Sequence, residues 1–267
     1  VDYSEETFER IKTEYLDFVS KIRIPEFTFI PISALEGDNI VNPSEKMDWY
    51  KGSTLLYKLE NVYVGNDYDY INSRFAVQQV IRPQTKEFRD YRAYSGMVAG
   101  GVFKKGDKVR VLPSGFGSTI KKIDSFDGEL EEIYPPMAAN ILLEDEIDLS
   151  RGGMIVKENN QPKIGQDIDM MLCWMSDTPL RPRGKYLIKH TSQEVRCIIK
   201  EVLYKVDINT LHRVEDNSTI VLNDIGRVRI RTSKPLFYDA YSKNKFTGSL
   251  IIIDETTNTT VGAAMII

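Results

Sequence analysis

The spacing of apolar residues changes once along the chain, from a helical period near the start to the short runs typical of strands. In the first 22 residues, apolar positions recur every three or four residues. This pattern predicts an amphipathic helix with Ser4 as its N-cap and Pro25 marking its end. The face expected to be buried consists of Phe8, Ile11, Tyr15, Phe18, Val19 and Ile22.

A strand and a second helix are predicted next. Residues 27–32 form a compact apolar run that is typical of a buried strand in an α/β sheet, and residues 53–62 have helical spacing. The inward positions of that helix are expected to be Leu55, Leu56, Leu59 and Val62. Because a parallel sheet needs neighbouring strands to satisfy its edges, this order of elements predicts only part of an α/β domain.

Beyond Val62 the pattern becomes that of an all-β protein. Gly65, Asn66, Asp67 and Asp69 lie among tyrosines and predict a linker. Six short apolar runs with turn residues between them then predict a small closed barrel, because closure removes exposed strand edges. The predicted strands are residues 75–82, 91–99, 108–112, 119–126, 138–143 and 154–156.

A second set of strands predicts another barrel from about residue 165. Its strands are expected at residues 168–174, 184–190, 194–208, 219–232 and 249–267, with Pro179, Pro182, Pro235 and Gly248 in connections. The expected fold class is therefore mainly β, with two consecutive β-barrels after the end of an α/β domain. The expected boundaries are residues 1–72 for the α/β part and linker, 73–164 for the first barrel and 165–267 for the second.

Composition narrows the classes of function. The net charge of −4 gives no overall positive potential that would attract the phosphate backbone of DNA or RNA, so nucleic acid is not the expected partner. No apolar run approaches about 18 residues, and Glu5, Glu6 and Glu9 occupy positions where a signal peptide needs apolar residues. Cys173 and Cys197 are too few for a disulfide framework. These features favour a reducing cytoplasm and no membrane.

The sequence contains few candidates for catalytic, phosphate-binding or metal-ligating residues. A phosphate-binding loop needs the pattern G-x-x-x-x-G-K-[ST], which is absent, and Gly106 and Gly184 are expected to be turn residues. His190 and His212 have no second ligand at metal-binding spacing. Acidic turn residues lack the spacing of an oxygen-ligand loop, so no metal site is expected. These acidic residues are Glu129, Glu131, Glu132, Glu144, Asp145, Glu146 and Asp148.

Two groups of side chains leave alternatives open. A basic cluster either binds an anion or forms a solvated strand and turn face, and the second interpretation is favoured. Trp49 and Tyr50 fit an interface or local packing equally well, whereas Trp174 is expected in a core. The basic cluster consists of Arg181, Arg183, Lys185 and Lys189.

The loop after the first predicted strand resembles a guanine-contacting loop of GTP-binding domains. In those domains a Ser-Ala-Leu segment helps to hold the base through backbone amides and a short side chain, and here that segment is Ser33, Ala34 and Leu35. Residues 96–107 resemble a glycine-rich hairpin in the second domain of translation-factor GTPases. The resemblance implies the end of a P-loop GTPase domain followed by translation-factor domains 2 and 3.

A more specific resemblance is to the large, GTP-hydrolysing subunit of bacterial ATP sulfurylase. It covers nearly the whole chain through short motifs in the family's order. They are Ser33-Ala34-Leu35-x-Gly37-Asp38-Asn39, Trp49-Tyr50-x-Gly52-x-Thr54-Leu55-Leu56, Val80-x-Arg82-Pro83, Val111-Leu112-Pro113-Ser114-Gly115, Phe126-Asp127-Gly128-x-Leu130-Glu131-Glu132, Asp145-Glu146-Ile147-Asp148-x-Ser150-Arg151-Gly152, Val206-Asp207-Ile208-Asn209 and Thr260-Val261-Gly262-Ala263.

This resemblance implies a coupling role in sulfate assimilation. In the family, a small catalytic subunit forms adenylylsulfate and pyrophosphate from ATP and sulfate, and the large subunit hydrolyses GTP to drive that reaction. GTP and Mg²⁺ are implied for the intact subunit, with the small sulfate adenylyltransferase subunit as partner. The chain is expected to start just after the family's Asn-Lys-x-Asp guanine motif, so only Ser33, Ala34 and Leu35 are assigned to the nucleotide. No catalytic residue, bound cofactor or independent activity is expected in this fragment.

Two other functions remain as alternatives. A translation elongation factor has the same layout, but its Pro-Gly-Asp run is absent here and the negative charge disfavours a tRNA-binding surface. A free-standing β-barrel binding module does not explain the α/β segment at the start. The sulfurylase resemblance is therefore favoured.

Overall fold

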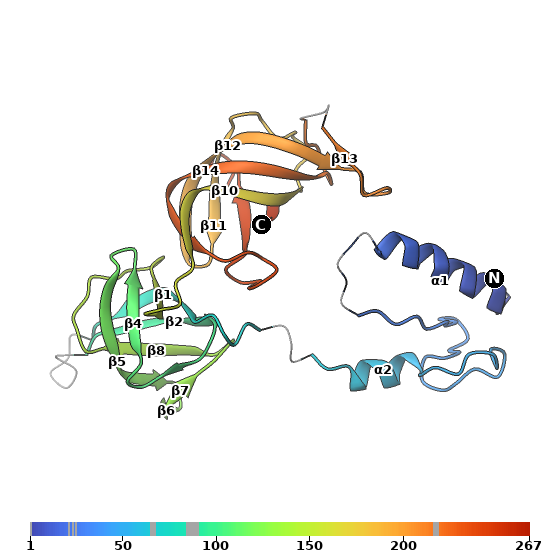
Figure 1. Ribbon diagram of the computed structural model, residues 1–267, viewed down its shortest axis with the longest axis horizontal. Coiled ribbons are helices and arrows are strands. Elements are labelled where there is room, and N and C mark those ends of the chain that lie inside the picture. The colour runs from blue at the N-terminus through green and yellow to red at the C-terminus, as the bar shows by residue number, and fades with distance from the viewer. Residues whose placement is uncertain are drawn as a thin grey trace. The chain divides into compact units, whose positions relative to one another are not determined.

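The computed structural model describes residues 2–20, 22, 24, 26–64, 68–83, 91–215 and 219–267 (Figure 1). The chain divides into two compact units, of which one contains residues up to 66 together with 209–211, and the other contains the rest. Pro25 and residues 65–67, which were interpreted from the sequence as a helix end and part of a linker, lie outside the described residues. The two units differ in structure, because the helices lie in the smaller unit and the named strands in the larger.

The first helix of the smaller unit begins as predicted. Helix α1 spans Glu5–Val19, and the Ser4 hydroxyl accepts the N–H of Thr7 at 3.2 Å, which is the expected N-cap. The predicted burial of its apolar face is wrong for most positions, because Ile11 and Tyr15 are 51% and 46% exposed and only Val19 is buried.

The predicted strand at residues 27–32 is not formed. These residues have no strand hydrogen bonds, and Phe27 and Ile32 are about half exposed. The nearest β feature is an isolated bridge between Ser33 and Asp38. The prediction was wrong because an apolar run becomes a strand only where neighbouring strands pair with it, and the described part of this unit provides none.

The second helix is shorter than predicted and faces solvent. Helix α2 spans Leu55–Asn61 and contains no buried residue, so the expected inward orientation is wrong. Leu59 is 62% exposed and Leu56 is 40% exposed. The cause is the same as for residues 27–32, since the apolar positions have no sheet to cover in the described part of this unit.

The larger unit begins with a closed barrel. Six strands pair in the order β4–β9–β1–β2–β8–β5, and β5 pairs back to β4 to close the ring. Short strands extend the barrel at its edges. The bounds are β1 Arg74–Ile81, β2 Ala93–Gly100, β3 Phe103–Lys104, β4 Lys108–Leu112, β5 Phe116–Ser125, β6 Gly128–Glu129, β7 Glu132–Ile133, β8 Ala138–Leu143 and β9 Met154–Lys157.

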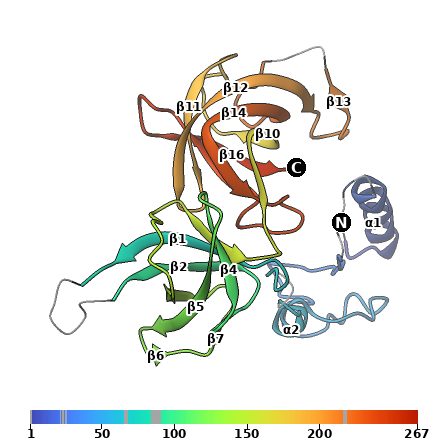
Figure 2. The same cartoon turned by 60° about the vertical axis from the view of Figure 1, so that its left-hand side comes forward.

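A second closed barrel follows in the same unit. Its ring runs β11–β15–β16–β10–β14–β12, and β12 pairs back to β11 (Figure 2). Trp174 and Tyr186 are fully buried in its core, which confirms the core position expected for Trp174. The bounds are β10 Lys163–Trp174, β11 Lys185–His190, β12 Gln193–Val206, β13 Arg213–Val214, β14 Ile225–Tyr238, β15 Ser249–Ile253 and β16 Thr260–Ile266.

Two predictions for the second barrel are wrong. Residues 249–267 form two strands, β15 and β16, joined by a turn, rather than one strand. The other error is in the bounds of β14. It begins six residues later than predicted and continues through Pro235, which was expected in a connection. Pro235 is tolerated there because pairing with β12 ends at Thr232, and pairing with β10 has a bulge between Gly165 and Asp167. A proline removes no ladder hydrogen bond at such a position. The mainly β fold with two barrels is confirmed.

Candidate functional site

The Ser33–Asp38 turn presents open backbone amides. The Ser33 hydroxyl and carbonyl accept the N–H groups of Glu36 and Gly37 at 3.3 and 2.8 Å, which closes the turn. Within the described residues, the amides of Ala34 and Leu35 donate to no protein group. Leu35 is 94% exposed. The turn can therefore donate hydrogen bonds to an acceptor on a ligand and cover one side of it with an apolar side chain.

Asp38 fixes the end of this turn. Its backbone carbonyl accepts the Ser33 N–H at 3.2 Å, while its carboxylate accepts the hydroxyls of Tyr3 and Ser44 at 2.9 and 2.8 Å. The Lys46 ammonium lies 3.8 Å from the same carboxylate. Hydrogen bonding from Ser44 lowers the pKa of Asp38 most, against the opposing effect of burial, and Tyr3 and Lys46 add to the lowering. The carboxylate therefore stays ionised and ties the turn to the residues before α1.

Asn39 links the turn to neighbouring segments through hydrogen bonds. Its side-chain amide donates to the Pro31 carbonyl at 2.9 Å and accepts the N–H of Ser44 at 2.8 Å, and the residue is only 2% exposed. Its own carbonyl accepts the N–H of Leu55, at the start of α2. A buried side chain with all these bonds made holds the turn in one conformation.

Aromatic rings pack beside the turn. Phe8 lies 5.3 Å from Trp49 and 6.4 Å from Tyr50 between ring centroids, and the Trp49 indole donates to the Tyr3 carbonyl at 3.0 Å. A cavity of about 430 Å³ opens next to Ser33 and is partly lined by Phe8, Trp49 and Tyr3. Trp49 and Tyr50 thus pack locally, against Phe8, which is one of the two alternatives left open by the sequence.

Among the described residues, the most buried ion pair joins the two barrels. The Arg74 guanidinium of β1 donates twice to the Asp239 carboxylate, at 2.9 Å for each bond, and its third nitrogen donates to Asn160. The Arg74 side chain is 2% exposed. The only signal in the sequence was an arginine next to the apolar run of β1, and its partner lies 165 residues away. Phe237 extends this junction by packing with Leu112, Met154 and Val156 of the first barrel.

His190 is buried in the second barrel and interacts electrostatically with Asp239 of the Arg74 ion pair. Its Nε2 lies 2.7 Å from the Thr247 carbonyl, which only accepts, so Nε2 carries the proton. Burial is the main cause that lowers the pKa of His190, so the ring is neutral. Among the residues that the structure describes, no three His, Cys, Asp or Glu side chains are grouped as a metal site.

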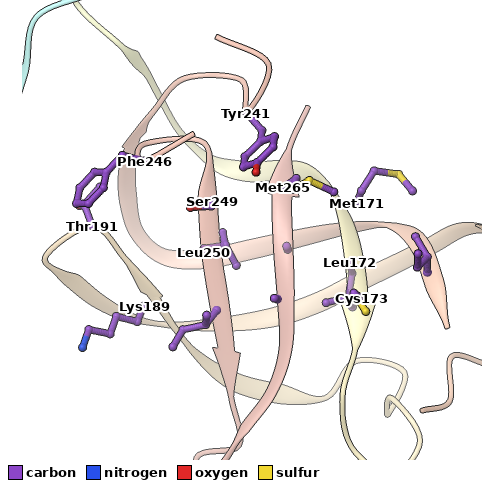
Figure 3. A pocket seen from close by; sticks show the side chains of 14 residues that line it. Met171, Leu172, Cys173, Lys189, Thr191, Tyr241, Phe246, Ser249, Leu250 and Met265 are labelled. Atoms are coloured by element: carbon purple, nitrogen blue, oxygen red, sulfur yellow. The ribbon is translucent and has the colours of Figure 1, made fainter. Parts of the chain in front are cut away.

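An apolar groove of about 590 Å³ lies on the outer face of the second barrel (Figure 3). Tyr241 and Phe246 stand at one end, with Lys189 and Cys173 towards the other (Figure 3). Cys173 is exposed, whereas Cys197 is buried inside the barrel and burial raises its thiol pKa to about 12. The two thiols therefore differ strongly in reactivity. Neither described helix is long and apolar enough to cross a membrane.

The chain is similar in sequence to two kinds of bacterial enzyme. It is 45% identical to the bifunctional enzyme CysN/CysC of Mycobacterium tuberculosis, over 99% of this chain and 43% of that protein. It is 44% identical to sulfate adenylyltransferase subunit 1 of Bacteroides thetaiotaomicron, over 100% of this chain and 56% of that protein. The chain thus spans about half the length of the curated relatives it matches.

A family model and solved structures provide further comparisons. A family model described as GTP-eEF1A C-terminal domain-like matches residues 167–267. Sup35 complexed with GDP has a TM-score of 0.67 at 15% identity, covering 100% of this chain and 66% of that one. The translation elongation factor SelB from Methanococcus maripaludis has a TM-score of 0.59 at 16% identity, covering 98% of this chain and 55% of that one. At these identities the likeness is one of fold.

Proposed function

The chain belongs to the sulfate adenylyltransferase subunit 1 family, and we propose on that basis that it is part of a regulatory GTPase subunit that drives adenylylsulfate formation in sulfate assimilation. The intact subunit would hydrolyse GTP while a small catalytic subunit converts ATP and sulfate to adenylylsulfate and pyrophosphate in the cytoplasm. Sequence identity of about 45% over the whole chain is the observation that carries this proposal.

Ser33, Ala34 and Leu35 are the residues we assign to the guanine. The amides of Ala34 and Leu35 are open, and an N–H donor favours the O6 acceptor of guanine over the amino group that adenine has at the same position. The exposed Leu35 side chain would cover one face of the base. Asp38 and Asn39 act as positioning residues, because their side chains form hydrogen bonds with protein groups that fix the turn.

GTP phosphates and Mg²⁺ do not fit the described residues of this chain. Gly106 lies in a β-turn with φ of +86°, and Gly184 lies in the turn before β11, so neither begins a helix that could bind phosphates. We therefore assign the phosphate and metal ligands to segments outside these 267 residues, and we expect the isolated chain to be inactive. Magnesium would supply charge neutralisation during GTP hydrolysis in the intact subunit.

The two barrels are proposed to carry the coupling. Formation of adenylylsulfate is unfavourable, so GTP hydrolysis must be linked to it through conformational states that differ in affinity for the ligands of both reactions. Barrels joined by a buried ion pair and an apolar junction provide one stiff body to transmit that change. We retain residues 1–72, 73–164 and 165–267 as the proposed functional segments.

Pyrophosphate release tests the proposal. The intact parent subunit would be mixed with the small subunit, ATP and sulfate, with and without GTP. We expect GTP to stimulate release, and we expect deletion of residues 67–267 to abolish that stimulation. Absence of stimulation together with tRNA-dependent GTP hydrolysis would contradict the proposal and support the alternative of a translation factor, which the fold alone also fits.

A further inference from the structure

Three cationic side chains surround an exposed isoleucine on the outer face of the second barrel. Lys185 of β11 is paired in register with Ile198 of β12, and Ile198 is paired with Arg231 of β14. Directly opposed residues on neighbouring strands project to the same face, so Lys185 and Arg231 flank Ile198 at a separation of about 10 Å between their strands. Arg196 lies two residues before Ile198 and projects to the same face.

These side chains line a cavity that is broadly open to solvent. The cavity has a volume of about 550 Å³ and is lined by all three cations, by Ile198 and by the hydroxyl-bearing residues Thr232 and Ser233. Glu255 is the only acidic residue in the lining, so the lining carries a net charge of +2 in a chain whose total charge is −4. A local positive surface on an acidic protein attracts multiply charged anions.

The basic cluster suggested by the sequence is divided differently in the structure. Arg181 is paired with Asp254 at 3.0 Å, and Lys189 lines the apolar groove on another part of the barrel. Lys185 instead joins Arg196 and Arg231, which sequence spacing does not connect. All four residues of the cluster interpreted from the sequence are exposed, which agrees with the favoured interpretation of a solvated face, but only Lys185 belongs to the new grouping.

The charges of this cavity are incompletely neutralised. Lys185 has no ion-pair partner in the part of the chain that the structure describes. Arg196 is paired with Glu255 at 2.6 Å, and Arg231 with Asp167 at 3.0 Å through one terminal nitrogen. Both arginines are more than half exposed, and exposed ion pairs are weak, so a ligand with several charged oxygens can compete with these carboxylates.

We propose that this cavity binds a small, multiply charged phosphate-type anion. Lys185 provides a point charge, and the planar guanidinium groups of Arg196 and Arg231 provide the geometry for bidentate contacts with phosphate oxygens. The Ser233 hydroxyl adds a neutral donor beside them. Inorganic pyrophosphate is the simplest probe with two phosphate groups. The site is separate from the Ser33–Asp38 turn and does not rest on the proposed GTPase function.

Calorimetric titration of the 267-residue chain with pyrophosphate tests this proposal. We expect saturable binding that weakens as salt is added. Lys185→Gln and Arg231→Gln are each expected to weaken binding about tenfold, because each removes a charge-assisted contact. Glu255→Gln should strengthen binding about two- to fivefold, because it removes the carboxylate that competes for Arg196.

Lys189→Gln is the matched control. It removes the same charge from the same strand and an exposed position, but it lies in the apolar groove, so pyrophosphate binding should be unchanged. Titrations with AMP and ATP show whether the cavity prefers a free anion or phosphate groups carried by a nucleotide. Either preference supports the site if Lys185→Gln weakens binding of the preferred ligand. The proposal would be overturned by absence of saturable pyrophosphate binding, by equal weakening with Lys189→Gln, by weakening with Glu255→Gln, or by equal affinity for sulfate.

Discussion

Arg74 offers the strongest test of how the two barrels are held together. Its guanidinium is 2% exposed and makes two 2.9 Å bonds to Asp239, so replacing Arg74 with methionine leaves a buried carboxylate without its cation. Breaking one side of a buried pair typically costs about 3–5 kcal/mol. For a unit of roughly 200 residues this corresponds to a fall in Tm of about 6–20 °C.

Urea unfolding followed by tryptophan fluorescence measures this change. Trp174 is buried in the second barrel, and a Trp49→Phe background removes the signal of the smaller unit. Asp239→Leu should be destabilising as well, but the double variant should lose clearly less than the sum of the two single variants, because neither charge is then left alone. Additive effects, within about 0.5 kcal/mol, would refute the reasoning.

The control for this experiment is an ion pair of similar length on the surface. Lys104 and Glu132 lie 2.8 Å apart, but both side chains are about half exposed. Lys104→Met should therefore change stability by less than about 1 kcal/mol. A loss as large as that of Arg74→Met would show that burial is not the deciding factor.

Three further predictions follow from the barrels. A maleimide should label Cys173 rapidly and Cys197 only on unfolding, as mass spectrometry of the labelled chain would reveal, because Cys197 is buried with a thiol pKa of about 12. Gly96→Ala should lower Tm, since its Cβ would clash with the backbone carbonyl of Ala76 in the neighbouring strand β1. The pKa of Asp169 is lowered in the folded state, mainly by hydrogen bonding from Arg229. The ionised Asp169 therefore stabilises the fold at pH values above its unfolded pKa of about 3.9. This stabilisation is lost as the pH falls through the lower pKa of the folded state. The stability difference between wild type and Asp169→Asn in urea should accordingly shrink in acid, and a constant difference would contradict this.

Local patterns predicted local structure well. The strands β4 and β8 have the predicted bounds, because alternating apolar residues between turn residues determine which face is buried. The Ser4 cap was also predictable, since it depends on a side chain and an amide three residues away. These features need information from only a few neighbouring residues.

Features that depend on distant partners were not predictable. The apolar run at residues 27–32 is compatible with a strand, but whether it becomes one depends on other strands. The grouping of Lys185 with Arg231 depends on the register of three strands, and spacing along the chain carries no such information. The Ser33–Leu35 turn was found only through its family resemblance, because three common residues after an apolar run have no distinctive periodicity.

Guanine nucleotide binding tests the central claim most directly. The intact parent subunit would be titrated with a fluorescent GDP analogue as wild type, as Ala34→Pro, which lacks the proposed amide donor, and as Lys51→Ala, an exposed control in the same unit. We predict that Ala34→Pro weakens binding about 5- to 100-fold, corresponding to an unsatisfied hydrogen bond, while Lys51→Ala leaves it unchanged. Equal binding by wild type and Ala34→Pro would contradict the assignment of this turn to the guanine.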